Sequence, residues 1–294
     1  MKILVALGTT AQDSFVVNEV ARLAGNTWAD VTLLGIETVT SSEVPPFSAS
    51  LQADEVHPLV QALRDLRGRF LSQFKAEESP YKAEASAHEV VKVENNLWED
   101  LNVLRSAPKQ LITRIRPGNP ARAILTEAKQ FPCDLIVFGN SLDGNASDIG
   151  RKSKKVIHEA DTSVLVVAKT KQPRRIVACL DHDRVSQYSL EMINQMVTLY
   201  QADLEIVGVS ATEALPGEVD DKMTQILKYY ANNGIKTLVR TVPRNSLEAF
   251  VAQASRGNLV ALWMGRQSLL HRVISPKGMD RLLDSSDYSV LILR

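Results

Sequence analysis

The chain has 294 residues, enough for two domains of ordinary size, each with its own hydrophobic core. Its 34 lysines and arginines balance 34 aspartates and glutamates, which excludes an overall field that would attract nucleic acid or an anionic membrane. No apolar run approaches the roughly 20 residues that span a bilayer. The two cysteines, Cys133 and Cys179, lie at or beside expected buried strands. The sequence therefore predicts a protein of the reducing cytoplasm without membrane insertion, and it gives little support for a zinc site.

Short apolar runs rich in valine, isoleucine and leucine recur along the chain without polar alternation, as in strands buried on both faces of a parallel sheet. In the first half these runs are 2–7, 31–36, 110–115, 133–140 and 163–168. After Pro173 the series restarts, with runs at 174–180, 204–209, 236–241, 258–265 and 289–293. The chain is therefore predicted to contain two copies of one unit, over residues 1–170 and 174–294.

Helical patterns lie between the apolar runs, with apolar residues spaced three and four apart. They predict helices at 13–24, 120–130, 186–200 and 246–255. Because strands that alternate with helices favour right-handed crossovers, we expect an α/β fold of two doubly wound, mainly parallel five-stranded sheets with flanking helices. The linker at 169–174 is too short for independent tumbling, so the two domains should pack as an intramolecular pseudo-dimer.

The first copy carries an insertion over about 40–108, where about seventy residues separate two expected strands and the second copy uses fewer than thirty. The insertion contains a turn-rich segment at 40–50 and two expected helices, at 58–75 and near 84–105. Two interpretations stay open. The insertion is either a longer crossover that caps the sheet or packs on the other domain, or a docking or regulatory element built on the basic, amphipathic stretch 63–75.

The loops after the first and fourth strands are where an open α/β sheet binds ligands, beyond the carboxyl ends of its strands. In the first copy the fourth strand runs into a loop with Gly139, Gly144 and Gly150, and a helix is expected to start near Arg151–Ser153. Glycines let the backbone approach a ligand, and the free amides of a helix start attract anions. This pattern is typical of a phosphate site, although glycine spacing alone is a weak signal.

Four basic residues crowd the expected first turn of that helix: Arg151, Lys152, Lys154 and Lys155. The helix dipole disfavours cations there by a few tenths to about 1 kcal/mol each, and a bound polyphosphate would offset this cost. The alternative is a solvated basic helix start beside Asp148 and Glu159.

The order of motifs resembles a tandem universal stress protein over nearly the whole chain. The resemblance rests on KILVAL, VTLLGIE, the Gly118-Asn119-Pro120-Ala121 helix start, CDLIVFGNS with its glycine loop, and VIHEADTSVLVVAK. It implies a sheet of the adenine nucleotide α-hydrolase type and pairing of the two domains through their last strands. In one branch of the family it also implies binding of ATP.

The resemblance assigns candidate ligand residues. In the first copy, the adenine end would lie near Leu7, Gly8 and Ile36, and the phosphates near Gly139, Asn140, Gly144, Gly150, Arg151, Lys152 and Ser153. In the second copy the matching and weaker positions are Asp181, Val209, Gly265 and Gly278.

Both copies depart from the nucleotide-binding pattern. In the first, Gly139 and Gly150 are eleven residues apart where thirteen are expected, and Gly8 stands where the family has an aspartate that ends the first strand. In the second, Asp181 is present but Ser268 replaces a glycine. The end of the second loop matches either Gly278-Met279 or Pro276-Lys277.

These features predict a universal stress-type protein that binds an adenine nucleotide in its first domain, with Mg²⁺ only if the nucleotide is ATP. The nucleotide would order loop 139–153 and so change the surface offered to an unknown protein partner, with the second domain as a structural mate and a homodimer also possible. No catalytic or metal-binding residue is assigned. Alternatives are a slow ATPase, for which Asp143 or Asp148 are the only nearby acids, a ligand-free interaction or scaffold protein, and the soluble regulator of a cation transporter. Asp181-His182-Asp183 is better read as a helix cap than as a metal site.

Overall fold

The computed structural model describes residues 1–8, 10, 12–37, 57–75, 77–81, 88–94, 96–102, 107–140, 148–168, 172–180, 186–210, 217–265 and 268–294. The chain divides into two compact units, Met1–Thr162 and Ser163–Arg294. None of the described helices is long and apolar enough to cross a membrane.

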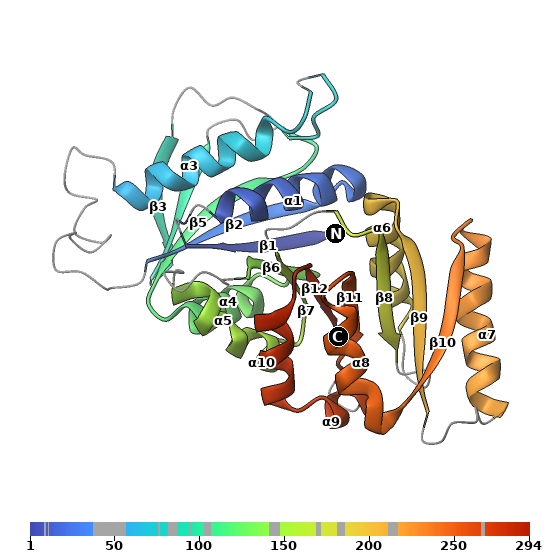
Figure 1. The fold of residues 1–294 in the computed structure, drawn as a ribbon. Coiled ribbons are helices and arrows are strands. Elements are labelled where there is room, and N and C mark those ends of the chain that lie inside the picture. The colour runs from blue at the N-terminus through green and yellow to red at the C-terminus, as the bar shows by residue number, and fades with distance from the viewer. Residues whose placement is uncertain are drawn as a thin grey trace. The chain divides into compact units, whose positions relative to one another are not determined.

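The first unit contains a mainly parallel sheet. Its parallel strands are β1 (Lys2–Leu7), β2 (Asp30–Glu37), β5 (Leu111–Pro117) and β6 (Leu135–Gly139), and an antiparallel hairpin of β3 (His88–Glu94) and β4 (Leu97–Asn102) is added beside β5. The strand order within this unit is β6-β1-β2-β5-β4-β3 (Figure 1).

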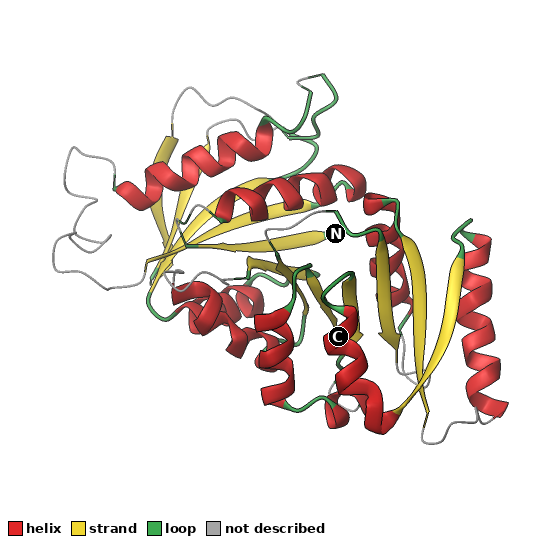
Figure 2. Cartoon of the chain, in the orientation of Figure 1, coloured by secondary structure: helices red, strands yellow, loops and turns green. Residues whose placement is uncertain are grey.

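Helices cover both faces of this sheet (Figure 2). The described helices of the unit are α1 (Asp13–Thr27), α3 (Pro58–Leu71), α4 (Pro120–Gln130) and α5 (Asp148–Glu159); α1 packs with α3, and α4 packs with α5. The central strands are buried on both sides, since every residue from Ile3 to Leu7 and from Leu135 to Phe138 is at most 2% exposed. This burial explains why their sequences show no polar alternation.

The segment near 84–105 forms the β3–β4 hairpin, so the helix expected there is wrong. Glu94 faces Leu97, and Asn96, which lies between the two strands, has a positive φ of 58°. Two-residue hairpin turns require positive φ, which asparagine tolerates better than most residues. Three valines in β3 add to the strand preference.

Helix α3 is a buried crossover and confirms the helix expected from residue 58, although it ends at Leu71. It packs against α1 and β2, and its apolar side, including Leu63 and Phe70, is fully buried. Two of its three arginines are bound inside the unit: Arg64 donates to Asp100 at 2.9 and 3.1 Å, and Arg67 donates to the Leu111 carbonyl. The turn-rich segment 40–50 lies outside the described residues.

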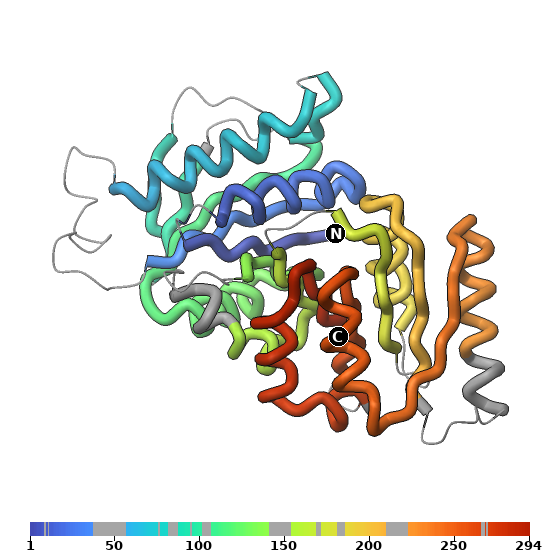
Figure 3. Tube along the Cα trace, in the orientation of Figure 1, coloured from blue at the N-terminus to red at the C-terminus, as the bar shows by residue number. Residues whose placement is uncertain are grey.

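The second unit has a sheet of the same kind. Its strands are β7 (Ser163–Val167), β8 (Arg175–Leu180), β9 (Asp203–Ser210), β10 (Thr237–Pro243), β11 (Leu259–Trp263) and β12 (Val290–Leu293), in the order β10-β9-β8-β11-β12-β7. Its helices are α6 (Gln187–Tyr200), α7 (Gly217–Asn232), η1 (Arg244–Ser246), α8 (Leu247–Ala254), α9 (Leu269–Val273) and α10 (Pro276–Ser285). Figure 3 shows α7 beside β10, against which it packs.

The two units repeat the same strand register. Leu7 of β1 faces Gly35 of β2, and Leu180 of β8 faces Gly208 of β9, so the KILVAL and RIVACL runs occupy equivalent places. The helix that follows each first strand also ends alike, at a left-handed residue.

Strand β7 ends the first of the two expected repeats and β12 ends the second, and these two strands pair with each other. They run antiparallel about a centre at Leu165 opposite Leu291. Two serine hydroxyls accept equivalent bonds, both of 3.2 Å: Ser163 from the Arg294 amide, and Ser289 from the Ala168 amide. Because β7 joins the second unit and the hairpin joins the first, each unit has six strands among its described residues, where five were expected per sheet.

Candidate functional site

The reversal of strand order in the first unit lies between β1 and β6. From β1 the chain proceeds through β2 to β5 on one side, and α4 then crosses back to place β6 on the other side. Val5 pairs with Val137 in parallel, so Leu7 and Gly139 end the two strands side by side, and Ile36 lies near the end of the neighbouring β2. The structure thus brings Leu7, Gly8, Ile36, Gly139 and Asn140 to one edge of the sheet, where ligands bind in open α/β folds.

A residue that sequence reasoning missed, Gln12, lies over this edge. Its side-chain amide donates to the Asn140 carbonyl. A Cβ added to Gly139 would lie 3.2 Å from Gln12 Cδ and 3.1 Å from Val16 Cγ2, so a larger residue here would push against both side chains. Gln12 precedes the first residue of α1 and belongs to no motif, so no sequence pattern indicates its role.

The loop from β1 to α1 closes on Asp13, which is 5% exposed. One carboxylate oxygen, Oδ2, accepts the amide of Gly8 at 3.0 Å and the amide of Thr10 at 2.6 Å. The acid that the family pattern places at the end of the first strand is therefore absent, and an acid five residues later binds the loop backbone. The Gly8 amide already donates within the protein.

Helix α5 begins at Asp148, three residues before the expected start. Acidic residues are common at helix starts, and Asp148 is the residue of this sequence that fits that preference. Lys154 and Lys155 consequently fall in the second turn, where the dipole penalty is weaker, and Lys155 pairs with Glu159 at 3.4 Å. The first amides of the helix, up to Gly150, have no partner within the helix itself.

Some of the predicted phosphate residues and nearby acids lie outside the described part of the chain. Gly144 and Asp143 lie outside the described residues, and so do the side chains of Asp148, Arg151, Lys152 and Ser153.

The second unit presents a different residue at the place of Gly139. Leu135 pairs with Ile3, and Leu259 pairs with Ile176, the residue equivalent to Ile3. Counting four residues on from each leucine makes Trp263 the structural equivalent of Gly139, whereas the sequence match used Gly265. A Cβ on Gly265 would lie 2.8 Å from the Trp263 ring. A buried indole thus fills the place where the first unit has no side chain.

The helix start of the second unit is also occupied. Ser275 precedes α10, and its hydroxyl accepts the Gly278 amide at 2.9 Å. A Cβ on Gly278 would lie 2.6 Å from Glu248 Oε1. Val209 lies buried near the end of β9, and Asp181 lies outside the described residues. The Gly278 amide, bound by Ser275, is therefore less available to a phosphate than the first amides of an uncapped helix.

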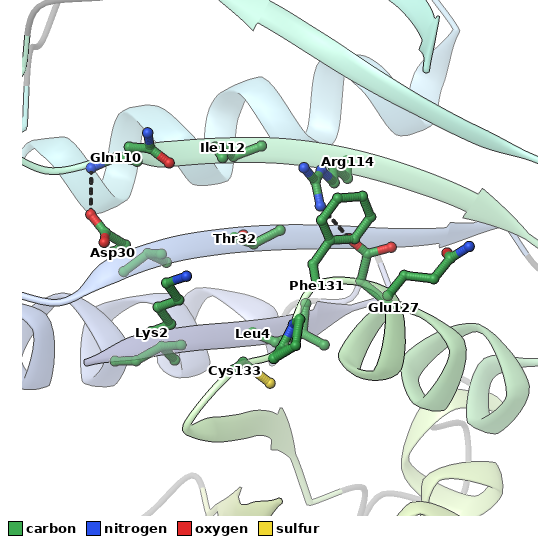
Figure 4. Close-up of a pocket in the computed structure, with 14 residues that line it drawn as sticks. Lys2, Leu4, Asp30, Thr32, Gln110, Ile112, Arg114, Glu127, Phe131 and Cys133 are labelled. Carbon is green, nitrogen blue, oxygen red and sulfur yellow. Dashed lines mark hydrogen bonds and ion pairs between the residues drawn. The ribbon is translucent and has the colours of Figure 1, made fainter. Parts of the chain in front are cut away.

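A groove of about 240 Å³ lies in the first unit at the opposite, amino-terminal ends of β1, β2 and β5 (Figure 4). Leu4, Thr32 and Ile112 line it, with Lys2 and Asp30 at one end and Phe131 at the other.

Beside the groove lies a buried ion-pair cluster. The Arg114 guanidinium carbon lies 3.7 Å from the centre of the Phe131 ring, and Arg114 binds Glu127 at 2.7 Å and Glu99 at 3.0 Å. Arg116 binds the other oxygen of Glu127 at 2.6 Å. These side chains neutralise one another. Because Glu99 belongs to β4, the arginines to β5 and Glu127 to α4, the cluster holds the hairpin and α4 to the sheet.

Burial raises the pKa of the Cys133 thiol and of the Cys179 thiol to about 12. Neither thiol should therefore react with iodoacetamide at pH 8 in the folded protein, because the thiolate is the reactive form. Mass spectrometry of alkylated protein, native against denatured, measures this. Rapid modification of native Cys133 would contradict it. Because the thiol pKa is raised in the folded state, the folded protein holds these protons more tightly than the unfolded chain does. The free energy of unfolding therefore falls as pH rises from the unfolded-state pKa towards about 12.

A family model of the universal stress proteins matches residues 1–168, which is more than half of the chain. The chain belongs to the universal stress protein family. No curated protein matches it.

Solved structures share the fold of this universal stress protein family member. A universal stress protein from Archaeoglobus fulgidus DSM 4304 gives a TM-score of 0.56 at 12% identity, covering 100% of this chain and 96% of its own. A putative universal stress protein from Pseudomonas aeruginosa UCBPP-PA14 gives 0.57 at 16% identity, covering 99% and 92%. The cytoplasmic domain of a prokaryotic cation chloride cotransporter gives 0.52 at 11% identity, covering 99% and 94%. Identities this low establish the fold alone.

Proposed function

We propose that this protein binds an adenine nucleotide in its first unit, beyond the carboxyl ends of β1 and β6. The observation that carries the proposal is that β6 ends at the reversal of strand order in Gly139, which presents no side chain, and is followed by helix α5. The adenine would lie near Leu7, Gly8 and Ile36. The phosphates would meet the first amides of α5, with Arg151 and Lys152 as counter-charges.

Nucleotide binding would require Gln12 to move. Its side chain lies against Gly139 and donates to the Asn140 carbonyl, so a ligand at this edge has to replace that bond. The loop that carries Gln12 leads directly into α1. Binding would therefore change the conformation of the β1–α1 loop as well as that of the loop after β6. We infer that the ligand alters the surface offered to a protein partner through these two loops.

We propose that the second half is a universal stress-type domain that serves as a structural mate. The equal registers of β1–β2 and β8–β9 and the pairing of β7 with β12 about Leu165 and Leu291 support this. Trp263 and the Ser275 cap argue against a second nucleotide site. One nucleotide per chain is the expected stoichiometry, with Mg²⁺ only in the case of ATP.

Calorimetric titration of the purified chain with ATP, ADP and AMP, with and without Mg²⁺, tests the proposal. Lys152→Ala removes one charge-assisted phosphate contact and should weaken binding about tenfold, which corresponds to about 1.4 kcal/mol. Lys277→Ala is the matched control, because Lys277 lies at the start of α10 in the second unit. No heat and no thermal shift with any of the three nucleotides would sink the proposal.

A ligand-free interaction protein is the second candidate, favoured by the observation that internal side chains bind the end of β6 in the first unit and the start of α10 in the second. The fold shared with a cotransporter's cytoplasmic domain makes a regulator of a cation transporter one form of this candidate. Absence of nucleotide from freshly purified protein, together with a failed titration, would favour it. Phosphate release above background would instead favour a slow ATPase.

A further inference from the structure

Strand β10 is an edge of the second unit's sheet, since among the described strands it pairs only with β9. Two neighbouring apolar side chains on it are open to solvent: Leu238 is 57% exposed and Val239 is 42% exposed. Their side chains point to opposite faces, because neighbours in a strand alternate. Exposed apolar residues on an unpaired strand mark an edge that pairs readily with another chain.

The first unit shows what covers the equivalent edge. Leu33 of β2 faces Thr113 of β5, and Ile206 of β9, the equivalent of Leu33, faces Val239 of β10. Thr113 and Val239 are therefore equivalent. Thr113 is only 1% exposed, because β4 pairs with β5 and places Asp100 opposite it. The insertion supplies this cover to the first copy, and the described strands of the shorter second copy include no counterpart of β4.

The first unit also indicates which charge an added strand would place opposite β10. Arg114 of β5 is equivalent to Arg240 of β10, and β4 places Glu99 opposite Arg114 with a 3.0 Å contact to its Nε. Arg240 binds Glu205 at 2.6 Å, yet its side chain remains 57% exposed. Its Nε donates to Glu205, so a strand added beside β10 would meet the terminal nitrogens of its guanidinium group.

We propose that the outer edge of β10 is a docking site for an extended segment of a partner protein. The segment pairs antiparallel with β10, as β4 does with β5, and carries an acidic residue opposite Arg240 between apolar residues. Backbone hydrogen bonds supply affinity and the acidic residue supplies register. This proposal does not depend on nucleotide binding.

A second copy of this chain is a poorer occupant. Strand β10 has no acidic residue to place opposite Arg240 of another copy. The other open edge among the described strands, β3, has the acids but is interrupted by a register shift between Lys92 and Glu94 and carries charges at Glu89, Lys92 and Glu94. Bulges and charged residues are the usual protection of an edge against pairing.

A fluorescent peptide with the sequence of residues 96–102, NLWEDLN, is the probe, titrated with the full chain and followed by anisotropy. We expect saturable binding that falls about tenfold or more when the peptide residue corresponding to Glu99 is lysine, equal to about 1.4 kcal/mol. Val239→Asp and Leu238→Asp should each weaken binding at least as much, because they place an acid against an acidic strand.

Val93→Asp is the matched control, since Val93 is 44% exposed on β3. It should leave peptide binding unchanged. Equal binding to wild type and both β10 variants would overturn the proposal, since the peptide would then be held elsewhere. Sedimentation of the chain alone provides a second measurement: self-association that Val239→Asp abolishes would also overturn it, because the occupant would then be a second copy.

Discussion

Replacing Glu127 by glutamine is expected to lower the free energy of unfolding by about 3 kcal/mol. The Glu127 side chain is 1% exposed and lies between two guanidinium groups, of Arg114 at 2.7 Å and of Arg116 at 2.6 Å. Glutamine keeps the shape but removes the charge, so it leaves two buried cations with one other acid, Glu99, near Arg114. Denaturant unfolding monitored by circular dichroism measures the change.

Glu248→Gln is the control for this prediction. Glu248 pairs with Arg281 at 2.7 Å, but the two side chains are 39% and 76% exposed, so the loss should stay below about 1 kcal/mol. Equal effects of the two substitutions would contradict a stabilising role for the buried cluster. The contrast matters for the fold, because the cluster joins β5, α4 and the hairpin that the first copy has gained.

Changing Gly35 to alanine is expected to destabilise the protein by about 1–3 kcal/mol. A Cβ at this position would lie 2.4 Å from Cδ1 and 3.2 Å from Cγ of Leu63, whose side chain is fully buried. Because α3 packs against β2 at this point, either the leucine or the helix has to shift. Thermal and denaturant unfolding of the variant measure the cost.

Gly208→Ala is an internal control, because Gly208 occupies the equivalent register position in β9. Its added Cβ would find Met223 Cε at 3.5 Å, an ordinary contact. Alanine also restricts the unfolded chain, so this variant should be neutral or more stable by up to about 1 kcal/mol. A Gly35→Ala variant as stable as Gly208→Ala would show that α3 adapts to β2 without strain.

Local patterns identified all ten of the strands expected in the repeats, because strands buried on both faces need unbroken apolar runs. They failed in the insertion, where the segment near 84–105 was predicted as a helix. Three valines and the Asn95-Asn96 pair favour a hairpin in this segment, because asparagine tolerates the positive φ of a tight hairpin turn. The sequence also predicted α4 with its correct limits, since Asn119 caps it and Pro120 fits its first position.

The candidate site was predicted less completely. Strand ends at Leu7 and Gly139 followed from the order of elements, because parallel strands bring their carboxyl ends to one edge. The position of Gln12 over Gly139 was not predictable, since it depends on where α1 packs against β6. Likewise, matching glycines along the sequence selected Gly265, whereas strand register identifies Trp263 as the equivalent residue.

The amino-acid sequence by itself determined the class of fold and the positions of the ten expected strands. These properties follow from local periodicity, which records how each segment is buried. Only the tertiary structure decided that Gln12 lies against Gly139, that β7 pairs with β12, and that β4 covers β5 while β10 keeps an open edge. The physical reason is that register and edge pairing join residues far apart in the chain, and no local pattern specifies which distant strand supplies the missing hydrogen bonds.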